Sequence, residues 1–238
     1  MYILGIWTYL RWHIAQKRIR MLFYLHVSTQ GEMTPSLVKG HNNNVLQSNY
    51  NRTSRYAILV NDMLNDFIHG KLKCDRAAQI IPKIKLILEK ARQNDIPIFY
   101  CNDQHLPIDT YELKLWGPHA MKDTDGAKVI DELRPSAYDY IVPRRRYSSF
   151  DGTSLNSSFE GTYNGKGVNT IIMTGVHTHI CVKHTVYDAF VRGYAVIVAE
   201  DGAEAFTGDD HEAGLKYMKQ IYCARIEKVS DILKSISK

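Results

Sequence analysis

From Tyr56 onward, short continuous apolar runs alternate with stretches in which apolar residues recur every three or four positions. Apolar runs of about four to eight residues are typical of strands buried on both faces of a sheet, and the wider spacing is typical of helices with one buried face. In the first such helix, the apolar face consists of Ile80, Ile81, Ile84, Ile87 and Leu88. The pattern predicts strands at residues 56–60, 96–101, 138–142, 170–174 and 195–199, and helices at residues 77–93, 181–192 and 211–220.

Strands that alternate with helices of this length favour right-handed crossovers and a parallel sheet covered on both faces. The predicted fold class is therefore α/β, a three-layer α-β-α arrangement around a central, mainly parallel sheet, as in Rossmann-like folds. We expect residues 56–238 to form one domain, since no internal repeat or low-complexity tract interrupts them.

Residues 1–55 have a different character, with a basic aromatic stretch followed by a polar run, and we predict no core there. They hold seven lysines and arginines and one acid, a net charge of +6, which leaves −1 for the rest of a chain whose total is +5. A near-neutral body argues against nucleic acid as a partner. This basic N-terminal extension could be a translated upstream region, an arginine-rich targeting peptide or an amphipathic surface helix.

The four cysteines, Cys74, Cys101, Cys181 and Cys223, are widely spaced, so neither a zinc knuckle nor a disulfide framework is indicated. Free cysteines favour a reducing compartment, and we expect a cytoplasmic protein. The apolar start of the chain is broken by Arg11, far short of the roughly 20 residues that span a bilayer, so no membrane partner is expected either.

Polar or reactive residues follow the predicted strands at the points where each strand ends. Asp62 comes after the first strand, Asp103 and His105 after the second, Arg144 after the third, and residues 175–181 after the fourth. In open parallel sheets, ligands bind beyond the carboxyl ends of the strands. The sequence therefore predicts a site at this edge of the sheet.

Cys181 follows a strand and a glycine turn, where a helix is expected to begin. Exposed N–H groups and the helix dipole stabilise a thiolate at such a place, so we expect a lowered thiol pKa and a nucleophilic cysteine. The same N–H groups can hold an oxyanion. The other three cysteines are expected to be buried structural residues.

Five segments in this order resemble the isochorismatase-like hydrolases, a superfamily that includes nicotinamidases, N-carbamoylsarcosine amidases and isochorismatases. The resemblance covers residues 56–238 and implies the isochorismatase-like hydrolase fold. Its segments are Val-Asn-Asp-Met-Leu-Asn-Asp-Phe at 60–67, Asp-Gln-His at 103–105, Trp-Gly-Pro-His at 116–119, Arg-Arg-Arg-Tyr-Ser-Ser-Phe at 144–150 and Gly-Val-His-Thr-His-Ile-Cys-Val at 175–182.

The resemblance implies a catalytic triad in which Asp62 is the acid and Cys181 the nucleophile. Asp62 would take the thiol proton and pass it to the leaving amine. Arg144 occupies the position of the family's lysine, and we expect it to act as a fixed positive charge that lowers the thiol pKa. A second departure is Leu64, where the family has glutamine. The resemblance also implies a cis peptide before His177, whose N–H would form an oxyanion hole with that of Cys181.

Asp103, His105 and His119 resemble the nicotinamidase metal site, and they offer the ligands of an open catalytic zinc site. Iron or manganese would also suit them. In the family, the metal binds the pyridine nitrogen of the substrate and orients it. The side chains of His177, His179 and His184 are expected to line the pocket or face solvent, because the family uses no such histidine as a base.

Cys181 argues for amide chemistry, because the isochorismatases of this superfamily cleave a vinyl ether and lack the nucleophilic cysteine. The metal residues then favour a nicotinamidase-like enzyme that releases ammonia. We also expect a homo-oligomer, either a dimer or a tetramer. The alternatives are an N-carbamoylsarcosine or other ureido amidase, and an isochorismatase-type hydrolase. A member of a different class, a non-catalytic protein that binds a small ligand, would be expected to lose the nucleophile first.

Overall fold

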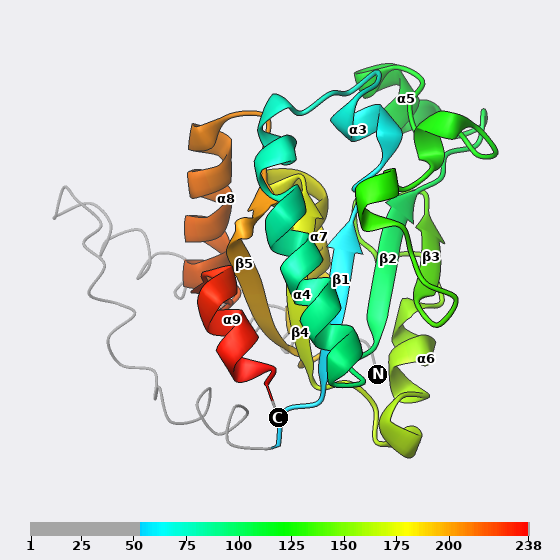
Figure 1. Cartoon of the computed structure of the whole chain (residues 1–238). Helices are drawn as coiled ribbons and strands as arrows, with labels where there is room; N and C mark the ends of the chain where they lie inside the picture. The colour runs from blue at the N-terminus through cyan, green and yellow to red at the C-terminus, as the bar shows by residue number, and fades with distance from the viewer. Residues whose placement is uncertain (1–52, 238) are drawn as a thin grey trace, which may run out of the picture. The chain divides into compact units, whose positions relative to one another are not determined.

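The computed structural model describes residues 53–237, and these contain one sheet of six parallel strands (Figure 1). The predicted basic extension lies almost entirely outside the described residues. In space the strands follow the order β3-β2-β1-β4-β5-β6, so the α/β prediction with a parallel central sheet is confirmed. The strands are β1 Tyr56–Asn61, β2 Ile98–Asp103, β3 Tyr140–Arg144, β4 Thr170–Val176, β5 Ala195–Glu204 and β6 Arg225–Glu227.

Helices cover both faces of the sheet and enclose a separate core on each (Figure 1). Along β1, Ile58 and Val60 face α4 and α9, while Ala57 and Leu59 face α6, α7 and α8. This alternation explains why the strand reads as a continuous apolar run. The helices are α3 Asn65–Ile68, α4 Ile81–Gln93, α5 Thr110–Trp116, α6 Leu155–Glu160, α7 Lys183–Val191, α8 Gly208–Ile221 and α9 Val229–Ser235, with short 3₁₀ turns at Asp75–Gln79, Asp125–Ala127, Asp131–Leu133 and Tyr163–Gly165.

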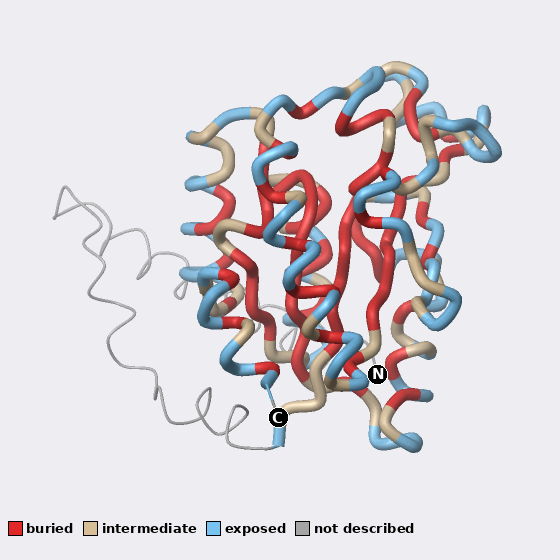
Figure 2. The backbone as a smooth tube through the Cα atoms, in the orientation of Figure 1, coloured by how far each residue is buried: buried red, intermediate tan, exposed pale blue. Residues whose placement is uncertain are grey.

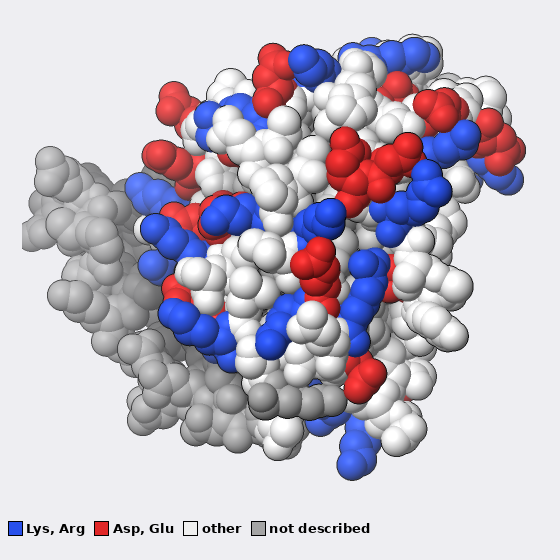
Figure 3. Space-filling view, viewed as in Figure 1, with Lys and Arg blue, Asp and Glu red and all other residues white. Residues whose placement is uncertain are grey.

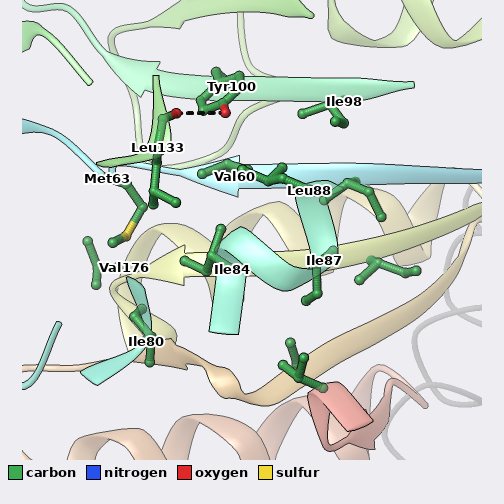
Figure 4. Close-up of a cluster of buried hydrophobic side chains, with 14 of the residues drawn as sticks. Val60, Met63, Ile80, Ile84, Ile87, Leu88, Ile98, Tyr100, Leu133 and Val176 are labelled. Carbon is green, nitrogen blue, oxygen red and sulfur yellow. Dashed lines mark hydrogen bonds between the residues drawn. The ribbon is translucent and has the colours of Figure 1, made fainter. Parts of the chain in front are cut away.

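The apolar stripe of α4 packs on the sheet, as its spacing predicts. Ile84, Ile87 and Leu88 are buried against strand residues that include Val60, and the hydroxyl of Tyr100 donates a hydrogen bond of 2.8 Å to the Leu133 carbonyl (Figure 4). Figure 2 shows the same distribution over the molecule, with buried residues concentrated along the central strands. This layer holds the strands in place and so fixes the positions of the residues at their ends.

Three predicted helix starts are wrong, and one of them is that of α8, which begins at Gly208 and not at residue 211. The helix predicted from residue 77 begins at Ile81, because Pro82 lacks an N–H and fits only in the first turn, and a 3₁₀ turn precedes it. The helix predicted to begin at Cys181 is an α-helix only from Lys183. It is preceded by a π-helix at Thr178–Val182, so Cys181 is the fourth residue of that turn rather than its first.

Strands β2 and β3 also lie two residues later than predicted, and β5 continues to Glu204. Asp103 and Arg144 are therefore the last residues of their strands and form one register pair. A pattern of apolar residues does not include Asp103 and Arg144 in the strands because both are polar, yet both are buried. They are buried because they pair with each other at the site and not because they belong to an apolar run.

The surface of the described part carries charges of both signs. On the face seen in Figure 3, lysines and arginines are interspersed with acidic residues, so no continuous basic surface lies on it. None of the helices among the described residues is long and apolar enough to cross a bilayer.

Candidate active site

The residues predicted at the strand ends meet at one edge of the sheet. Asp62 follows β1, Asp103 ends β2, Arg144 ends β3, and Cys181 lies in the π-helix after β4. Connections from β1 lead to β2 and β3 on one side, while β4 lies on its other side, so the strand order reverses between β1 and β4. Parallel sheets form their ligand crevice at this point. In Figure 1 the arrowheads of β1 and β2 point toward the end where α3 and α5 lie.

Arg144 lies between two carboxylates. Its guanidinium donates a hydrogen bond to Asp62 Oδ2 and another, of 2.6 Å, to Asp103 Oδ1. The N–H of Asp103 donates to Asp62 Oδ1 at 2.8 Å. Arg144 is only 1% exposed, although arginine is rarely buried without partners. The structure therefore holds the arginine beside Asp62, the acid that the resemblance implies.

The two carboxylates differ in proton affinity. Burial raises the pKa of Asp62 to about 7, an effect that Arg144 opposes and Asp103 strengthens. Burial would raise the pKa of Asp103 as well, but the positive charge of Arg144 and the hydrogen bond and charge of His105 have a larger effect, so its pKa is lowered. Asp103 is thus the permanent anion of the pair, and Asp62 is the one able to exchange a proton near neutral pH.

The Cys181 sulfur and a carboxylate oxygen of each of Asp62 and Asp103 lie within 4.8 Å of one another, and the thiol is close enough to Arg144 for its charge to act on it. The expected low thiol pKa is wrong for the free protein. Burial raises the pKa of Cys181 well above its ordinary value, and the positive charge of Arg144 offsets only part of this. The resting side chain is therefore a neutral thiol that needs a base.

The turn that carries Cys181 depends on a close backbone approach. Gly175 has a φ of 95°, and a Cβ there would lie 2.0 Å from the Asn61 carbonyl oxygen, so no other residue fits. The peptide between Val176 and His177 is cis, as the resemblance implies. The use of the His177 and Cys181 N–H groups as an oxyanion hole stays a prediction.

Two groups of neighbours hold this turn. Gly214 of α8 lies so close to it that a Cβ would meet the His179 backbone at 3.2 Å. On the other side, the hydroxyl of Thr185 in α7 accepts a hydrogen bond of 3.0 Å from the Ser149 N–H and donates one to the Ser149 hydroxyl. Ser149 thus ties the loop after β3 to the helix after Cys181, which gives a physical reason for the serine in the fourth segment.

Asp103, His105 and His119 form a second cluster, in which one ligand atom of each lies within 4.8 Å of the others. Asp103 Oδ2 is 3.7 Å from His105 Nε2 and 3.8 Å from His119 Nε2. Ligand bonds of about 2.0 to 2.2 Å to zinc leave atoms about this far apart. The His119 Nδ1 hydrogen-bonds to the Gly117 carbonyl at 2.8 Å, which directs its other nitrogen to the cluster.

The unpaired ring nitrogens of His105 show whether a metal would fit this cluster. Both of its ring nitrogens are buried, and neither has a hydrogen-bond partner among the described residues. Its Nε2 also lies 3.8 Å from Glu112 Oε2, and its Nδ1 lies 3.5 Å from Asp109 Oδ2. Buried polar atoms without partners are rare. A divalent metal bound by Asp103, His105 and His119 would satisfy Nε2, so the residues fit the group.

Sequence reasoning misses Glu112 and Asp109. Glu112 faces the cluster as a possible fourth ligand, and Asp109 lies where it can orient His105, held in turn by hydrogen bonds from Arg145. The available signal is their position in the short segment between His105 and His119, where two acids follow a pair of ligands at one strand end.

A cavity of about 20 Å³, partly open to solvent, is lined by the thiol residue and by residues of the cluster. A cavity of this size holds about one water molecule, so a substrate must displace side chains. The indole of Trp116 donates a hydrogen bond of 3.0 Å to the Tyr147 hydroxyl across it. The cavity is lined by Phe67, Leu72, Asp103, Glu112, Trp116, His119, Tyr147, His177, Ile180, Cys181 and Phe206.

Other residues named from the sequence lie away from this cavity. Leu64 is fully buried in the core beside α4, so its departure from the family's glutamine changes packing and not the cavity lining. His179 is half-buried and His184 is exposed, and neither lines the cavity. Cys74 and Cys101 are buried as expected, but Cys223 is exposed, because it follows the end of α8 at the surface.

Comparison with known proteins agrees with this geometry. A family model described as the isochorismatase domain matches residues 56–229. The structure of an N-carbamoylsarcosine amidase from Thermoplasma acidophilum is 37% identical, with a TM-score of 0.68, and the match covers 74% of this chain and 96% of that one. The structure of a pyrazinamidase of Pyrococcus horikoshii in complex with zinc is 28% identical, with a TM-score of 0.66, and the match covers 73% and 99%.

Enterobactin synthase component B of Escherichia coli (strain K12) is 31% identical over 169 residues, which are 69% of this chain and 58% of that protein. This chain therefore spans less than two thirds of that relative. The family model, by contrast, covers most of this chain, including every strand of the sheet and both clusters of the site. The chain belongs to the isochorismatase family of hydrolases.

Proposed function

We propose that the protein is a cysteine-dependent amidase that cleaves the C–N bond of a small amide and releases ammonia, with nicotinamide as the leading substrate. The observation that carries this proposal is a cavity lined both by Cys181, with Asp62 and Arg144 close to its thiol, and by Asp103 and His119 of the metal-type cluster. A substrate held at the metal-type cluster would present its carbonyl carbon to the thiol.

The reaction begins when the Asp62 carboxylate takes the thiol proton and the Cys181 sulfur attacks the carbonyl carbon. The N–H groups of His177 and Cys181 hold the resulting oxyanion. Asp62 then gives the proton to the departing nitrogen, the C–N bond breaks, and ammonia leaves behind a thioester. Water adds to the thioester with Asp62 as the base, and the thiol and a carboxylic acid are regenerated. The pKa of about 7 suits Asp62 to give and take a proton near neutral pH.

Arg144 takes no part in proton transfer in this scheme, because a guanidinium does not usefully give up its proton. Its pKa is raised further by Asp103 and Asp62, although burial opposes this. It contributes a fixed positive charge beside the sulfur, which stabilises the thiolate as that thiolate forms.

The metal proposed for the second cluster is zinc, with iron or manganese as alternatives. Asp103, His105 and His119 would hold it, and Glu112 is positioned to join them. When bound, the metal would supply a site for a ring nitrogen of the substrate and would orient the amide. The zinc complex of the pyrazinamidase relative supports this assignment.

N-carbamoylsarcosine is the second candidate substrate, because the amidase from Thermoplasma acidophilum is 37% identical over nearly its whole length. Other ureido acids and isochorismatase-type substrates belong to the same alternative, and they all carry a carboxylate. A non-catalytic ligand-binding protein is the alternative from another class. Against it stands the retained thiol with its base and cation.

One panel tests these options. Nicotinamide, pyrazinamide, N-carbamoylsarcosine and ureidoacrylate are each assayed for ammonia release by the full chain, with zinc, iron and manganese measured on the same preparation. Release from the first two, with about one metal per chain, is the expected result. Release from the ureido acids alone by metal-free protein would favour the second candidate, and no release from any of them would favour a binding protein.

A homo-oligomer and a cytoplasmic location are the remaining proposals. Large exposed apolar side chains on α7 and α8, namely Phe190, Tyr187, Tyr217 and Ile221, support an interface, because exposed apolar patches often mark one. Sedimentation of the full chain is expected to give a dimer or a tetramer. A single monomeric species would remove that proposal.

A further inference from the structure

His177 carries a side chain that the proposed mechanism leaves unused. The residue lines the cavity together with Cys181, and it is 3% exposed. Neither ring nitrogen has a hydrogen-bond partner among the described residues. Most buried polar side chains are paired, so two unpaired nitrogens beside a binding cavity point to a ligand that pairs with them.

The surroundings of the ring are apolar. Phe206 stacks on it with ring centroids 3.9 Å apart, and Phe67 meets it edge-on at 5.6 Å. Burial, with a smaller contribution from His179, lowers the pKa of His177 to about 3. The imidazole is therefore neutral and offers one N–H donor and one acceptor nitrogen, with no charge.

The rest of the cavity also lacks a positive charge to attract an acid. Its lining, within the described part of the chain, includes the carboxyl groups of Asp103 and Glu112 and no lysine or arginine. Arg144 lies behind it with hydrogen bonds to Asp62 and Asp103. A divalent metal held by both Asp103 and Glu112 would be balanced by their two negative charges. A substrate carboxylate would therefore meet no net positive charge.

We propose that the imidazole of His177 is a substrate-binding, specificity-determining residue that hydrogen-bonds to a polar group of the bound amide and selects uncharged amides over ureido acids. This inference rests on the proposed function. The donor and the acceptor of a neutral ring match the amide or ring-nitrogen groups of a flat, uncharged substrate. The stacked Phe206 and the edge-on Phe67 fix the plane in which the two nitrogens lie.

Two substitutions separate this role from simple packing. His177→Phe keeps a ring that can stack on Phe206 and removes both nitrogens, whereas His177→Gln removes the ring and keeps a donor and an acceptor. His179→Phe is the matched control, because His179 also has a buried ring nitrogen without a partner among the described residues, but it does not line the cavity. Circular dichroism and melting temperature establish that each variant is folded.

The readouts are kcat and KM for nicotinamide with the zinc-supplemented full chain, and the calorimetric Kd for nicotinamide in a Cys181→Ala background, where no turnover is needed. We expect His177→Phe to raise KM and Kd about tenfold, the loss of about one hydrogen bond, with kcat changed less than about threefold. His177→Gln should recover most of the affinity, and His179→Phe should match wild type.

The reverse ranking would overturn the inference. If His177→Phe bound nicotinamide as tightly as wild type and His177→Gln bound it weakly, the side chain of His177 would serve only for packing. Turnover of N-carbamoylsarcosine alone, with no nicotinamide binding, would also overturn it while leaving the cysteine chemistry intact. If no amide is turned over but nicotinamide binds with the expected ranking, the proposed amidase activity fails and the assignment of His177 stands.

Discussion

At the scale of single residues, the site is organised around one buried arginine. Arg144 pairs with Asp62 and Asp103 at once, so it joins the catalytic cluster to the metal-type cluster. Lysine has a single nitrogen at its tip, whereas a guanidinium presents two terminal nitrogens in a fixed plane. This geometry lets one cation compensate two buried carboxylates.

Arg144→Ala is expected to raise the pKa of Cys181 beyond its already high value, because the cation opposes the effect of burial. A neighbouring charge is worth about 1 to 3 pKa units, so thiol alkylation at pH 8 should slow about tenfold or more. The alkylation rate of Arg144→Lys should lie between the rates of wild type and Arg144→Ala. The measurement is the pH dependence of alkylation in the three proteins.

The alanine variant should also unfold more easily, by about 3 to 5 kcal/mol, because two buried carboxylates lose their partner. Alkylation is therefore measured in urea-free buffer after the fold is verified. Arg134→Ala is the control, since Arg134 pairs with Asp131 at the surface. Identical alkylation profiles for wild type and Arg144→Ala would mean that Arg144 does not act on the thiol.

Glu112→Gln tests the metal-type cluster. The change removes a negative charge 3.8 Å from His105 Nε2, so zinc affinity should fall by at least about tenfold. Zinc is titrated against a competing chelator, with Glu89→Gln on the exposed side of α4 as the control. Unchanged affinity would restrict the ligand set to Asp103, His105 and His119.

The sequence identifies individual reactive residues well where a motif fixes them. Asp62, Arg144 and Cys181 are found by their place after strands, and they do converge. Their environment is harder to predict, because burial depends on contacts far along the chain. The high thiol pKa follows from the burial of Cys181, and the fit of Glu112 follows from the path of the chain that brings α5 to His105.

At the scale of elements, the turn that holds the nucleophile depends on a helix that follows it by more than 20 residues. Gly214→Val in α8 would place new atoms where a Cβ already lies 3.2 Å from the His179 backbone. We expect the turn to shift and kcat to fall at least about tenfold, with a loss of stability of about 1 to 3 kcal/mol.

Ala213→Val is the matched control for that experiment, since Ala213 is the exposed neighbour on the same helix. Both variants carry the same β-branched residue in α8 and so share its cost in helix propensity. Ammonia release and urea unfolding are measured on each. Equal rates for the two would show that the turn tolerates the added side chain.

Hydrophobic patterning predicts the long elements and misses the short ones. The first residues of β1, β4 and β5 are those predicted, because each run is apolar on both faces. The three-residue strand β6 and the four-residue helix α3 are too short to show a period. The π-helix around Cys181 packs closely against Gly214 of α8, and no local pattern records a contact between segments so far apart in the sequence.

At the scale of the whole molecule, the described residues begin with a segment that is hydrogen-bonded to the loop before β4. The N–H of Arg55 donates to Asn169 Oδ1 at 2.8 Å, and its Nε donates to the Gly167 carbonyl at 2.5 Å. Removal of residues 1–52 should leave melting temperature and rate unchanged, because these contacts remain. Removal of residues 1–55 should lower the melting temperature. Thermal melts and ammonia release on both forms check this, and a large drop for the shorter deletion would contradict it.

The order of the strands is the feature of the whole molecule that the sequence leaves open. Alternating strands and helices predict a parallel sheet, but not that β4 returns to lie beside β1. That return places Cys181 against Asp62, although 119 positions in the sequence separate them. Contacts of this range depend on the path of every connecting helix, and for that reason the cavity is visible only in the folded chain.

The proposed function depends on the Cys181 thiol acting as the nucleophile of an amidase. The most direct measurement is ammonia release from nicotinamide by the full chain, compared among wild type, Cys181→Ala and Cys223→Ala. Cys223 is exposed and outside the cavity, so its variant controls for the loss of a thiol. We predict that Cys181→Ala is inactive while it remains folded and that Cys223→Ala is as active as wild type. Full activity of folded Cys181→Ala protein would contradict it.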